Sequence, residues 1–390
     1  MGTNIKAKPY AIISGLALND NNRGTAALGY GAFAFLQQKG LLMDGMRLIK
    51  IVSRGNPFRK GLKRTSLVEH ISVDNKTWIL ETHAINPFVW KIFKLTNIAL
   101  PFSHLRFLIK RVSFVAALNG GDGFSDIYNT QTFYSRLYYT EIAMRAKIPL
   151  IQLPQTFGPF NDSDNYRLAQ KILRYSTKIY VRDKEFISEL EKMGLAYELT
   201  KDLSAYMQPE PWDIDIIPYN SIGINVSGLC YSNKFRTLSG QFEQYPELID
   251  RLIHYFLSKG KTVYLIPHSY HYGNPEENND DMVACRMAYN QLVDKSHVVF
   301  VDKNLRSPQV KYVISKMSFF IGTRMHANFA AIYSGVPLFG LAYSYKFAGA
   351  FNANGLDGDR QTHMINNINS EEIDRIISKI GAYYFTAIKH

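Results

Sequence analysis

The sequence predicts an α/β protein built from two doubly wound domains that face each other across a cleft. Short apolar runs bounded by polar or glycine-containing turns recur along the chain, as buried parallel strands do. Helical patterns separate these runs on both sides of a proline-containing, aperiodic stretch. We therefore expect an N-terminal domain at 1–205, a linker at 206–220 and a C-terminal domain at 221–390.

The N-terminal domain opens with a buried strand at 10–18, a polar turn at 19–24 and a helix from Thr25. This turn lacks the GxGxxG pattern, so a dinucleotide site is not favoured. The expected elements that follow alternate in the same way. They are strands at 46–53, 67–73, 112–118, 149–153 and 178–181, helices at 130–146, 164–175 and 184–193, and a short strand that runs to Asp202.

The C-terminal domain repeats the alternation. Its expected strands are 221–227, 262–266, 297–301, 317–321 and 338–342, and its expected helices are 240–258, 281–294, 308–315, 325–334 and 370–380. Gly335 and Pro337 mark the end of the fourth helix.

Composition and charge limit the class of protein, its compartment and the kind of partner that we expect. The 390 residues are 46% hydrophobic and 20% charged, and only two are cysteine, which fits a soluble protein of a reducing compartment. We find no signal peptide and no transmembrane run, so we expect a cytoplasmic location. The net charge is +12, and residues 47–111 alone hold 13 basic and three acidic residues. Such a cluster favours an anionic partner, although no nucleic-acid motif accompanies it.

Residues 86–111 interleave aromatic and aliphatic residues with Lys and Arg, and Pro101 divides them. One interpretation is a pair of amphipathic helices on a membrane surface. The other is a pair of core helices with a basic rim, and the sequence favours neither.

Charged groups gather where predicted strands end, which is where open α/β sheets bind ligands. They are Asp122 and Asp126, Arg182, His268, the pair Arg324 and His326, and Lys346. Arg and Lys suit phosphate and carboxylate, imidazole donates a proton near neutral pH, and a carboxylate orients a hydroxyl. Each of these charged residues could instead be an ordinary surface charge, and each histidine could be an ordinary core residue. No metal-ligand spacing appears.

Several of these motifs occur in an order that resembles the polysaccharide pyruvyl transferase family. They are the Asn/Gly turn before the first helix, GGD at 120–122, LPQTFGP at 153–159, YVRDKE at 180–185, LIPH at 265–268 and TRMHA at 323–327. The resemblance implies two Rossmann-like domains in a GT-B-like layout. It also implies transfer of a pyruvyl group from phosphoenolpyruvate to a sugar, which forms a ketal.

The resemblance assigns roles to residues of this chain. Arg182 and Arg324 would hold phosphoenolpyruvate with Lys346 and His268, and His326 would be the acid. Asp122 or Asp126 would act on the acceptor, and Asn22, Gln155 and Asp202 are further acceptor-side candidates. No cofactor or metal is implied, and the acceptor is expected on a lipid carrier at an anionic membrane surface.

Two other functions remain open at this stage. A GT-B glycosyltransferase that uses a nucleotide sugar would share the fold and a basic donor site. A two-domain solute-binding protein would hold a ligand in the same cleft, although such proteins usually carry a signal peptide.

Overall fold

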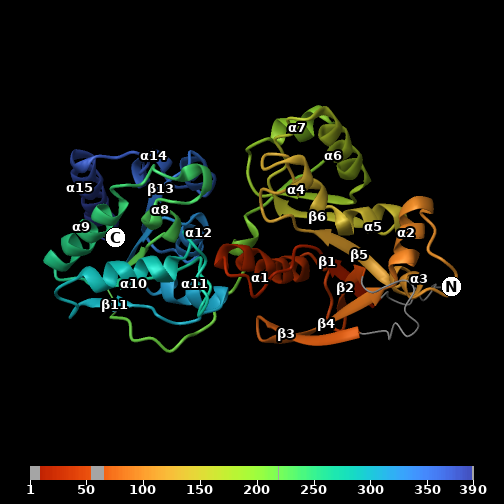
Figure 1. The fold of residues 1–390 in the computed structure, drawn as a ribbon, viewed down its shortest axis with the longest axis horizontal. Helices are drawn as coiled ribbons and strands as arrows, with labels where there is room; N and C mark the ends of the chain where they lie inside the picture. The colour runs from red at the N-terminus through yellow and green to blue at the C-terminus, as the bar shows by residue number, and fades with distance from the viewer. Residues whose placement is uncertain (1–8, 54–65, 218, 389–390) are drawn as a thin grey trace. The chain divides into compact units, whose positions relative to one another are not determined.

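The computed structural model describes residues 9–53, 66–217 and 219–388. The chain forms two compact units, one of residues 1–16 and 28–206 and the other of residues 17–27 and 207–390. Each unit is built around one sheet with helices on both faces (Figure 1).

The sheet of the first unit has eight strands in the order β3-β4-β2-β1-β5-β6-β7-β8. All neighbours pair in parallel except β3, which runs antiparallel to β4. The strands are β1 (Tyr10–Ile13), β2 (Arg47–Ser53), β3 (Ser66–Val73), β4 (Lys76–Ile85), β5 (Val112–Ala117), β6 (Leu150–Gln155), β7 (Lys178–Val181) and β8 (Glu198–Leu199).

The helices of the first unit match the predicted alternation with some differences. They are α1 (Arg23–Gln38), whose first five residues belong to the second unit, α2 (Pro87–Thr96), α3 (His104–Ile109), α4 (Thr130–Ser135), α5 (Tyr138–Ala146), α6 (Ser163–Tyr175) and α7 (Ile187–Lys192). The helix predicted at 130–146 is two helices, because the chain turns at Arg136 and Leu137. The strand β4 was not predicted from the sequence.

The sheet of the second unit has six parallel strands in the order β11-β10-β9-β12-β13-β14. The first strand of the unit, β9, therefore lies in the middle, with the next strands on one side and the later ones on the other. The strands are β9 (Ser221–Asn225), β10 (Thr262–Leu265), β11 (Val298–Phe300), β12 (Phe319–Gly322), β13 (Leu338–Ala342) and β14 (Thr362–Met364).

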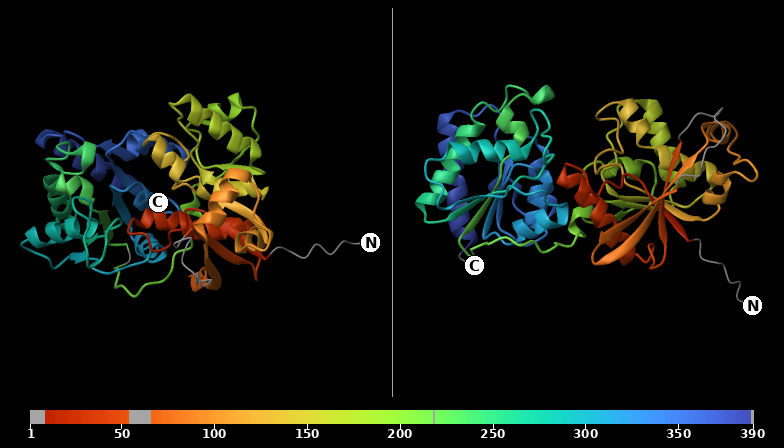
Figure 2. Two further views of the ribbon diagram at one scale, coloured as in Figure 1. Left: turned by 45° about the vertical axis from the view of Figure 1, so that its right-hand side comes forward. Right: turned by 60° about the horizontal axis from the view of Figure 1, so that its bottom comes forward.

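Apolar side chains alternate between the two faces of this second sheet, as a strand period of two requires. On β12, Phe319 and Ile321 join one hydrophobic cluster and Phe320 joins another. Figure 2 shows helices on both faces. They are α8 (Gly228–Ser232), α9 (Tyr245–Ser258), α10 (Asp281–Gln291), α11 (Ser307–Ser315), α12 (Met325–Ile332), α13 (Lys346–Ala353), α14 (Gly358–Gln361) and α15 (Ser370–Ala387). None of the described helices is long and apolar enough to cross a bilayer.

Residues 17–27 belong to the second unit, although the sequence placed them in the N-terminal domain. Arg23 causes this association, because its buried guanidinium lies 4.1 Å from the centre of the Tyr270 ring and donates to the carbonyl of Leu305 at 2.7 Å. The predicted linker at 206–220 also contacts this unit, where the Glu210 amide donates to the carbonyl of Pro308. Residue 218 of that linker lies outside the described residues.

Candidate functional site

The carboxyl ends of β9 and β12 form the point where the strand order of the second sheet reverses. The two strands are neighbours, yet the chain leaves β9 into α8 and leaves β12 into α12. Connections diverge here, and open α/β sheets bind ligands at such points. Arg324 occupies the N-cap position of α12, so the structure places it where the sequence predicted.

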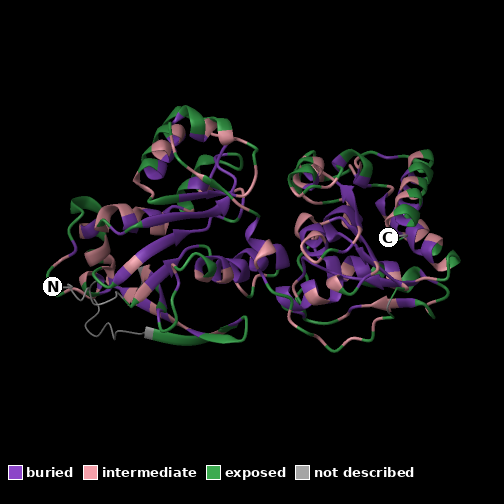
Figure 3. Ribbon diagram, turned by 180° about the vertical axis from the view of Figure 1, so that it is seen from behind, coloured by how far each residue is buried: buried purple, intermediate pink, exposed green. Residues whose placement is uncertain are grey.

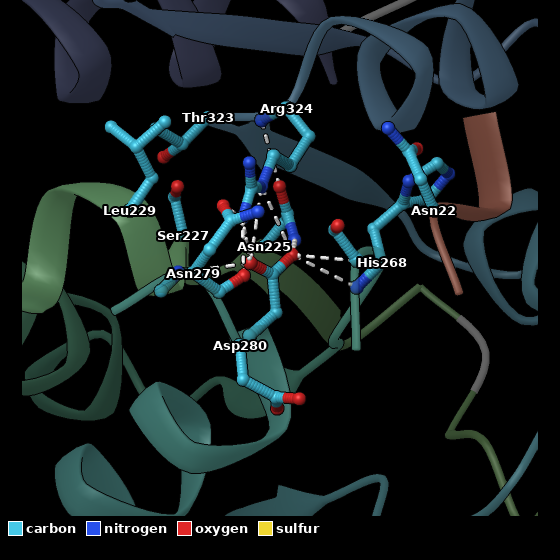
Figure 4. A network of polar contacts seen from close by, with 12 residues as sticks. Asn22, Asn225, Ser227, Leu229, His268, Asn279, Asp280, Thr323 and Arg324 are labelled. Atoms are coloured by element: carbon cyan, nitrogen blue, oxygen red, sulfur yellow. Dashed lines mark hydrogen bonds and ion pairs between the residues drawn. The ribbon is translucent and has the colours of Figure 1, made fainter. Parts of the chain in front are cut away.

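Arg324 is held by a carboxylate that the sequence analysis did not select. Its Nη2 lies 2.7 Å from Oδ1 of Asp281, the first residue of α10, and its Nε lies 3.1 Å from the same oxygen. Nη2 also donates to the carbonyl and the side-chain oxygen of Asn279. Figure 4 shows Arg324 and Asn279 within this network of polar contacts. The guanidinium is thereby fixed in one orientation at the mouth of α12.

Asp281 has no exposed surface and connects three segments of the second unit. Its carboxylate accepts from the backbone N–H groups of Gly228 at 2.9 Å, His268 at 3.1 Å and Ser269 at 2.9 Å. It also accepts from Nδ2 of Asn225, whose Oδ1 accepts from the Arg324 N–H. A Cβ at position 228 would lie 2.3 Å from the Asp280 backbone, so only glycine permits this approach.

His268 lies beside this network and is buried. Burial lowers its pKa well below the usual value, and His326, Arg23 and Arg324 lower it further. The ring is therefore neutral near pH 7 and suits a hydrogen bond better than a charge contact with phosphate. This restricts the donor-binding role predicted for His268 to that of a neutral partner.

His326, in the first turn of α12, packs against the first turn of α1. A Cβ added to Gly24 would lie 2.6 Å from Cγ and 2.7 Å from Nδ1 of His326. Asn22 bonds through Oδ1 to the Gly24 N–H and forms a backbone bridge with Ser269. Asn22 was predicted on the acceptor side of the N-terminal domain, but the structure places it in the second unit, near His268 (Figure 4).

Lys346 is the first residue of α13, which begins after a three-residue turn that follows β13, and β13 pairs with β12. Its partly buried side chain thus belongs to the same edge of the sheet as Arg324. The structure brings Arg324, His326, His268 and Lys346 to one edge of one unit.

Arg182 follows β7 in the first unit and is also fixed by carboxylates. Its Nη1 lies 3.0 Å from Asp202, its Nε lies 3.1 Å from Asp183, and Nε also donates to Thr156. A Cβ at Gly121 would lie 2.6 Å from Nη1, so Arg182 packs directly on the glycine loop after β5. Asp202, an acceptor-side candidate, orients Arg182 through one carboxylate oxygen, and its other oxygen accepts from the N–H and hydroxyl of Ser204.

The two candidate acceptor carboxylates have different surroundings. Asp126 is buried and accepts from the N–H groups of Asn161 and Asp162 and from the side chains of Asn161 and Asn165. Asp122 is partly exposed, accepts from the Tyr128 hydroxyl at 2.8 Å, and contributes to the field at Arg182. Asp126 therefore anchors the loop before α6, and Asp122 is the better placed of the two to meet a ligand.

Gln155 has no exposed surface, although the sequence predicted contact with an acceptor. Its oxygen accepts from the backbone and side chain of Asn119, and its nitrogen donates to Ala117 and Gln152. The bonds to Asn119 and Ala117 join the end of β6 to the end of the neighbouring β5, and the bond to Gln152 lies within β6. They give Gln155 a structural role beneath the glycine loop.

Comparison with known proteins identifies the family of this chain. The family model for polysaccharide pyruvyl transferase matches residues 22–345, which include every candidate except Lys346. The chain belongs to the polysaccharide pyruvyl transferase family. It is therefore an enzyme, and its activity is pyruvyl transfer in polysaccharide biosynthesis.

One relative is the amylovoran biosynthesis protein AmsJ of Erwinia amylovora, 23% identical over 305 residues that cover 73% of this chain and 69% of AmsJ. Similar solved structures include a UDP-N-acetylglucosamine 2-epimerase with 12% identity and a TM-score of 0.53. A putative enzyme of that name from Listeria monocytogenes has 10% identity and a TM-score of 0.50. Each match covers 97% of this chain and 89% of the other, and it supports the predicted α/β fold class alone.

Proposed function

We propose that this member of the family transfers the pyruvyl group of phosphoenolpyruvate to two hydroxyls of one sugar residue, forming a pyruvate ketal and releasing phosphate. The observation that carries the proposal is the fixed guanidinium of Arg324 at the mouth of α12, two residues before His326. A helix N-terminus and a preoriented guanidinium both favour a phosphate or carboxylate.

The ion pair with Asp281 fits this role because it uses Nε and Nη2 of Arg324. A carboxylate on that side holds the guanidinium plane still, which lowers the entropy that a ligand must remove when it binds. Lys346 adds a second cation for the phosphate, and neutral His268 adds a hydrogen bond.

The proposed reaction needs one acid and no oxidant. His326 protonates the methylene carbon of phosphoenolpyruvate, and the neighbouring carbon becomes an oxocarbenium centre. A sugar hydroxyl attacks that carbon and loses its proton. The bond to phosphate then breaks, and a second hydroxyl of the same sugar closes the ketal. Imidazole is suited to the first step because it titrates near neutral pH, and Arg324 stabilises the charge on departing phosphate.

The acceptor side of the proposal remains a set of predictions from the sequence. Asp122 would orient or deprotonate the sugar hydroxyl, and Arg182 would add to donor binding. The acceptor would be a lipid-linked oligosaccharide made in the cytoplasm, and phosphoenolpyruvate is the only small-molecule donor required.

The direct test incubates the protein with phosphoenolpyruvate and lipid-linked or aryl-linked sugars, and measures phosphate release together with the mass of the sugar product. We expect equal amounts of phosphate and ketal. The variant H326Q should keep its fold and bind the donor while turnover falls by roughly two orders of magnitude or more. His254→Gln, on the exposed face of α9, is the matched control and should behave as wild type.

Calorimetric titration distinguishes this proposal from the glycosyltransferase alternative. Phosphoenolpyruvate should bind, and R324A should weaken that binding. Binding of uridine or guanosine diphosphate without binding of phosphoenolpyruvate would favour the glycosyltransferase, and normal turnover by H326Q would remove His326 from the mechanism.

A further inference from the structure

Residues 86–111, here called the α2–α3 segment, carry a group of large apolar side chains that face solvent. Figure 1 labels both helices, and Figure 3 marks exposed residues in green. Leu95 is 75% exposed and Phe102 is fully exposed. The other exposed members are Phe88, Ile98 and Phe107.

The segment that carries these exposed side chains is firmly packed on the first unit. Phe93 of α2 and Leu105 and Leu108 of α3 have no exposed surface and belong to the hydrophobic core of the first unit. Arg145 of α5 fixes the end of α2 by donating to the Lys94 carbonyl and to Asn97. The inner faces thus anchor both helices, and the core does not use the outer apolar residues.

Phe102 is unusual in its backbone as well as its exposure. It has a φ of 60°, in the left-handed region that a bulky residue rarely adopts. The turn is closed by the Ser103 N–H and hydroxyl, which both bond to the carbonyl of Leu100. The fold therefore holds an aromatic ring fully in solvent at the cost of backbone strain, and strain of this kind clusters at functional positions.

The charged side chains of the segment itself all have one sign. The 26 residues of the segment contain five basic residues and no Asp or Glu. Among the exposed ones, Lys91 and Lys94 lie on α2, and the guanidinium of Arg111 lies 3.6 Å from the centre of the Phe107 ring. From outside the segment, Glu141 reaches Lys94 at 3.5 Å. Long basic side chains beside exposed aromatic rings are typical of helices that lie in a lipid interface.

We propose that the α2–α3 segment docks reversibly on an anionic lipid surface, with Phe88, Leu95, Ile98, Phe102 and Phe107 entering the interface and the basic side chains meeting the headgroups. Docking brings the enzyme to a lipid-linked acceptor, and in that respect alone the inference rests on the proposed function. Residues 54–65 include further basic residues. They lie outside the described residues, and the proposal does not depend on them.

Neither the attraction of basic side chains to the headgroups nor the insertion of apolar side chains attaches the protein permanently to a membrane. Each basic side chain near an anionic surface strengthens binding about fivefold, and each buried aromatic ring adds roughly tenfold. Charge attraction is screened by salt, so binding should weaken as ionic strength rises.

The test is sedimentation of the full-length protein with vesicles, without donor or acceptor. One set contains equal parts phosphatidylglycerol and phosphatidylcholine, and the other contains phosphatidylcholine only. We expect the protein to pellet with the anionic vesicles at low salt and to be released at high salt.

Two variants separate the apolar and the charged contributions. F102G removes the ring and relieves the left-handed strain, so it should weaken vesicle binding roughly tenfold without lowering the melting temperature. The double variant K91Q/K94Q should weaken it about twentyfold at low salt and little at high salt. The matched controls in the second unit are V293G, which removes an equally exposed apolar side chain, and K259Q/K303Q, and both should bind as wild type.

Protein that stays in the supernatant with anionic vesicles at low salt would overturn the inference. So would equal binding to neutral vesicles, normal binding by F102G, or a dimer in solution that F102G dissociates, because a second copy would then cover the segment. Turnover on a water-soluble acceptor is measured separately. F102G should keep it, so failure of vesicle binding and failure of pyruvyl transfer are distinguishable.

Discussion

Asp281 accepts hydrogen bonds from three backbone N–H groups, from Asn225 and from Arg324, and none of its surface is exposed. Arg324 carries the opposite charge. Each of the two buried charges is therefore stabilised by the other, because little water reaches the ion pair. Loss of one partner of a buried ion pair leaves the other charge uncompensated, which costs more than the pair itself contributes.

We therefore predict that D281N is unstable and binds phosphoenolpyruvate weakly. An amide of the same size cannot balance Arg324, and the expected loss of stability is about 3–5 kcal/mol. The exposed Asp357 is a control in the same unit, because its Oδ1 caps α14 through the N–H of Arg360, and Asn is an equally good cap. Urea unfolding and calorimetric donor titration should show a large effect in D281N and a small one in D357N. Equal effects would mean that Asp281 acts only as a helix-end residue.

The contrast between Arg324 and Asp281 shows what sequence can predict at the residue scale. The position of Arg324 and His326 at the start of α12 could be predicted because strand, turn and helix are consecutive in the chain. Asp281 is 43 residues from Arg324 in the sequence, and the ion pair between them forms only when β9, β10 and β12 assemble. The burial of Gln155 could not be predicted either, because its local motif gives no sign that Asn119 and Gln152 enclose its side chain.

At the scale of elements, the first turn of α1 sets the position of the proposed acid. Gly24 contacts His326 so closely that a methyl group at position 24 would overlap the imidazole. We predict that G24A reduces turnover severalfold or more, because the ring must move, while helix propensity itself would favour Ala. G349A, in α13 with nothing within 4 Å of its added Cβ, should keep full activity and gain up to about 1 kcal/mol of stability. Steady-state kinetics and thermal melts compare the two, and an unchanged kcat in G24A would contradict the contact.

Asp126 connects the loop after β5 to the start of α6, and its ionisation should make this connection sensitive to acid. Burial alone would raise its pKa, but hydrogen bonds from Asn161, Asp162 and Asn165 outweigh burial and hold the pKa below its usual value. A lowered pKa means that the unfolded chain binds the proton more readily. The stabilisation is therefore complete above about pH 4, the unfolded value, and is lost as pH falls through the folded value.

We predict that D126N lowers stability at pH 7 by about 2–3 kcal/mol, because an amide cannot accept all of these bonds. The difference from wild type should shrink as pH falls below about 4, because the wild-type protein then loses the stabilisation from this carboxylate as pH passes through its lowered folded pKa. Unfolding curves at several pH values test this. A variant that is fully stable yet inactive would return Asp126 to a catalytic role.

Most elements were predictable because long apolar runs and helix stops are local signals. The elements that were missed are short or mixed in character. α8 and β14 have five and three residues, too few for a period to appear, and β4 (KTWILETHAI) carries Glu81 and His83 among its apolar residues. Those two polar residues are buried and hydrogen-bond to each other, which no alternation rule anticipates.

At the scale of the whole molecule, the division between the two units does not follow the order of the chain. Residues 17–27 lie in sequence between β1 and the rest of the first unit, but they belong to the second. Arg23 is the main connection. It is 6% exposed, its Nε donates to Leu305, its Nη1 donates to Asp20 and Asn21, and its carbonyl accepts from Ser307. Linear sequence signals place domain boundaries at linkers and cannot reveal a segment that joins the other unit.

The last prediction follows from this association. R23A should destabilise the second unit by about 2–4 kcal/mol, because it leaves buried carbonyls without a donor and opens a cavity against Tyr270. The chain has three tryptophans, and Trp212 packs on the second unit, so a background with W78F and W90F reports on that unit alone. The control R286A, whose ion pair with Asp302 is half exposed, should change stability by less than about 0.5 kcal/mol. Urea unfolding followed by Trp212 fluorescence measures both. If R23A leaves this transition unchanged, residues 17–27 contribute little to the second unit, and the domain boundary predicted from the sequence would describe the folding units better.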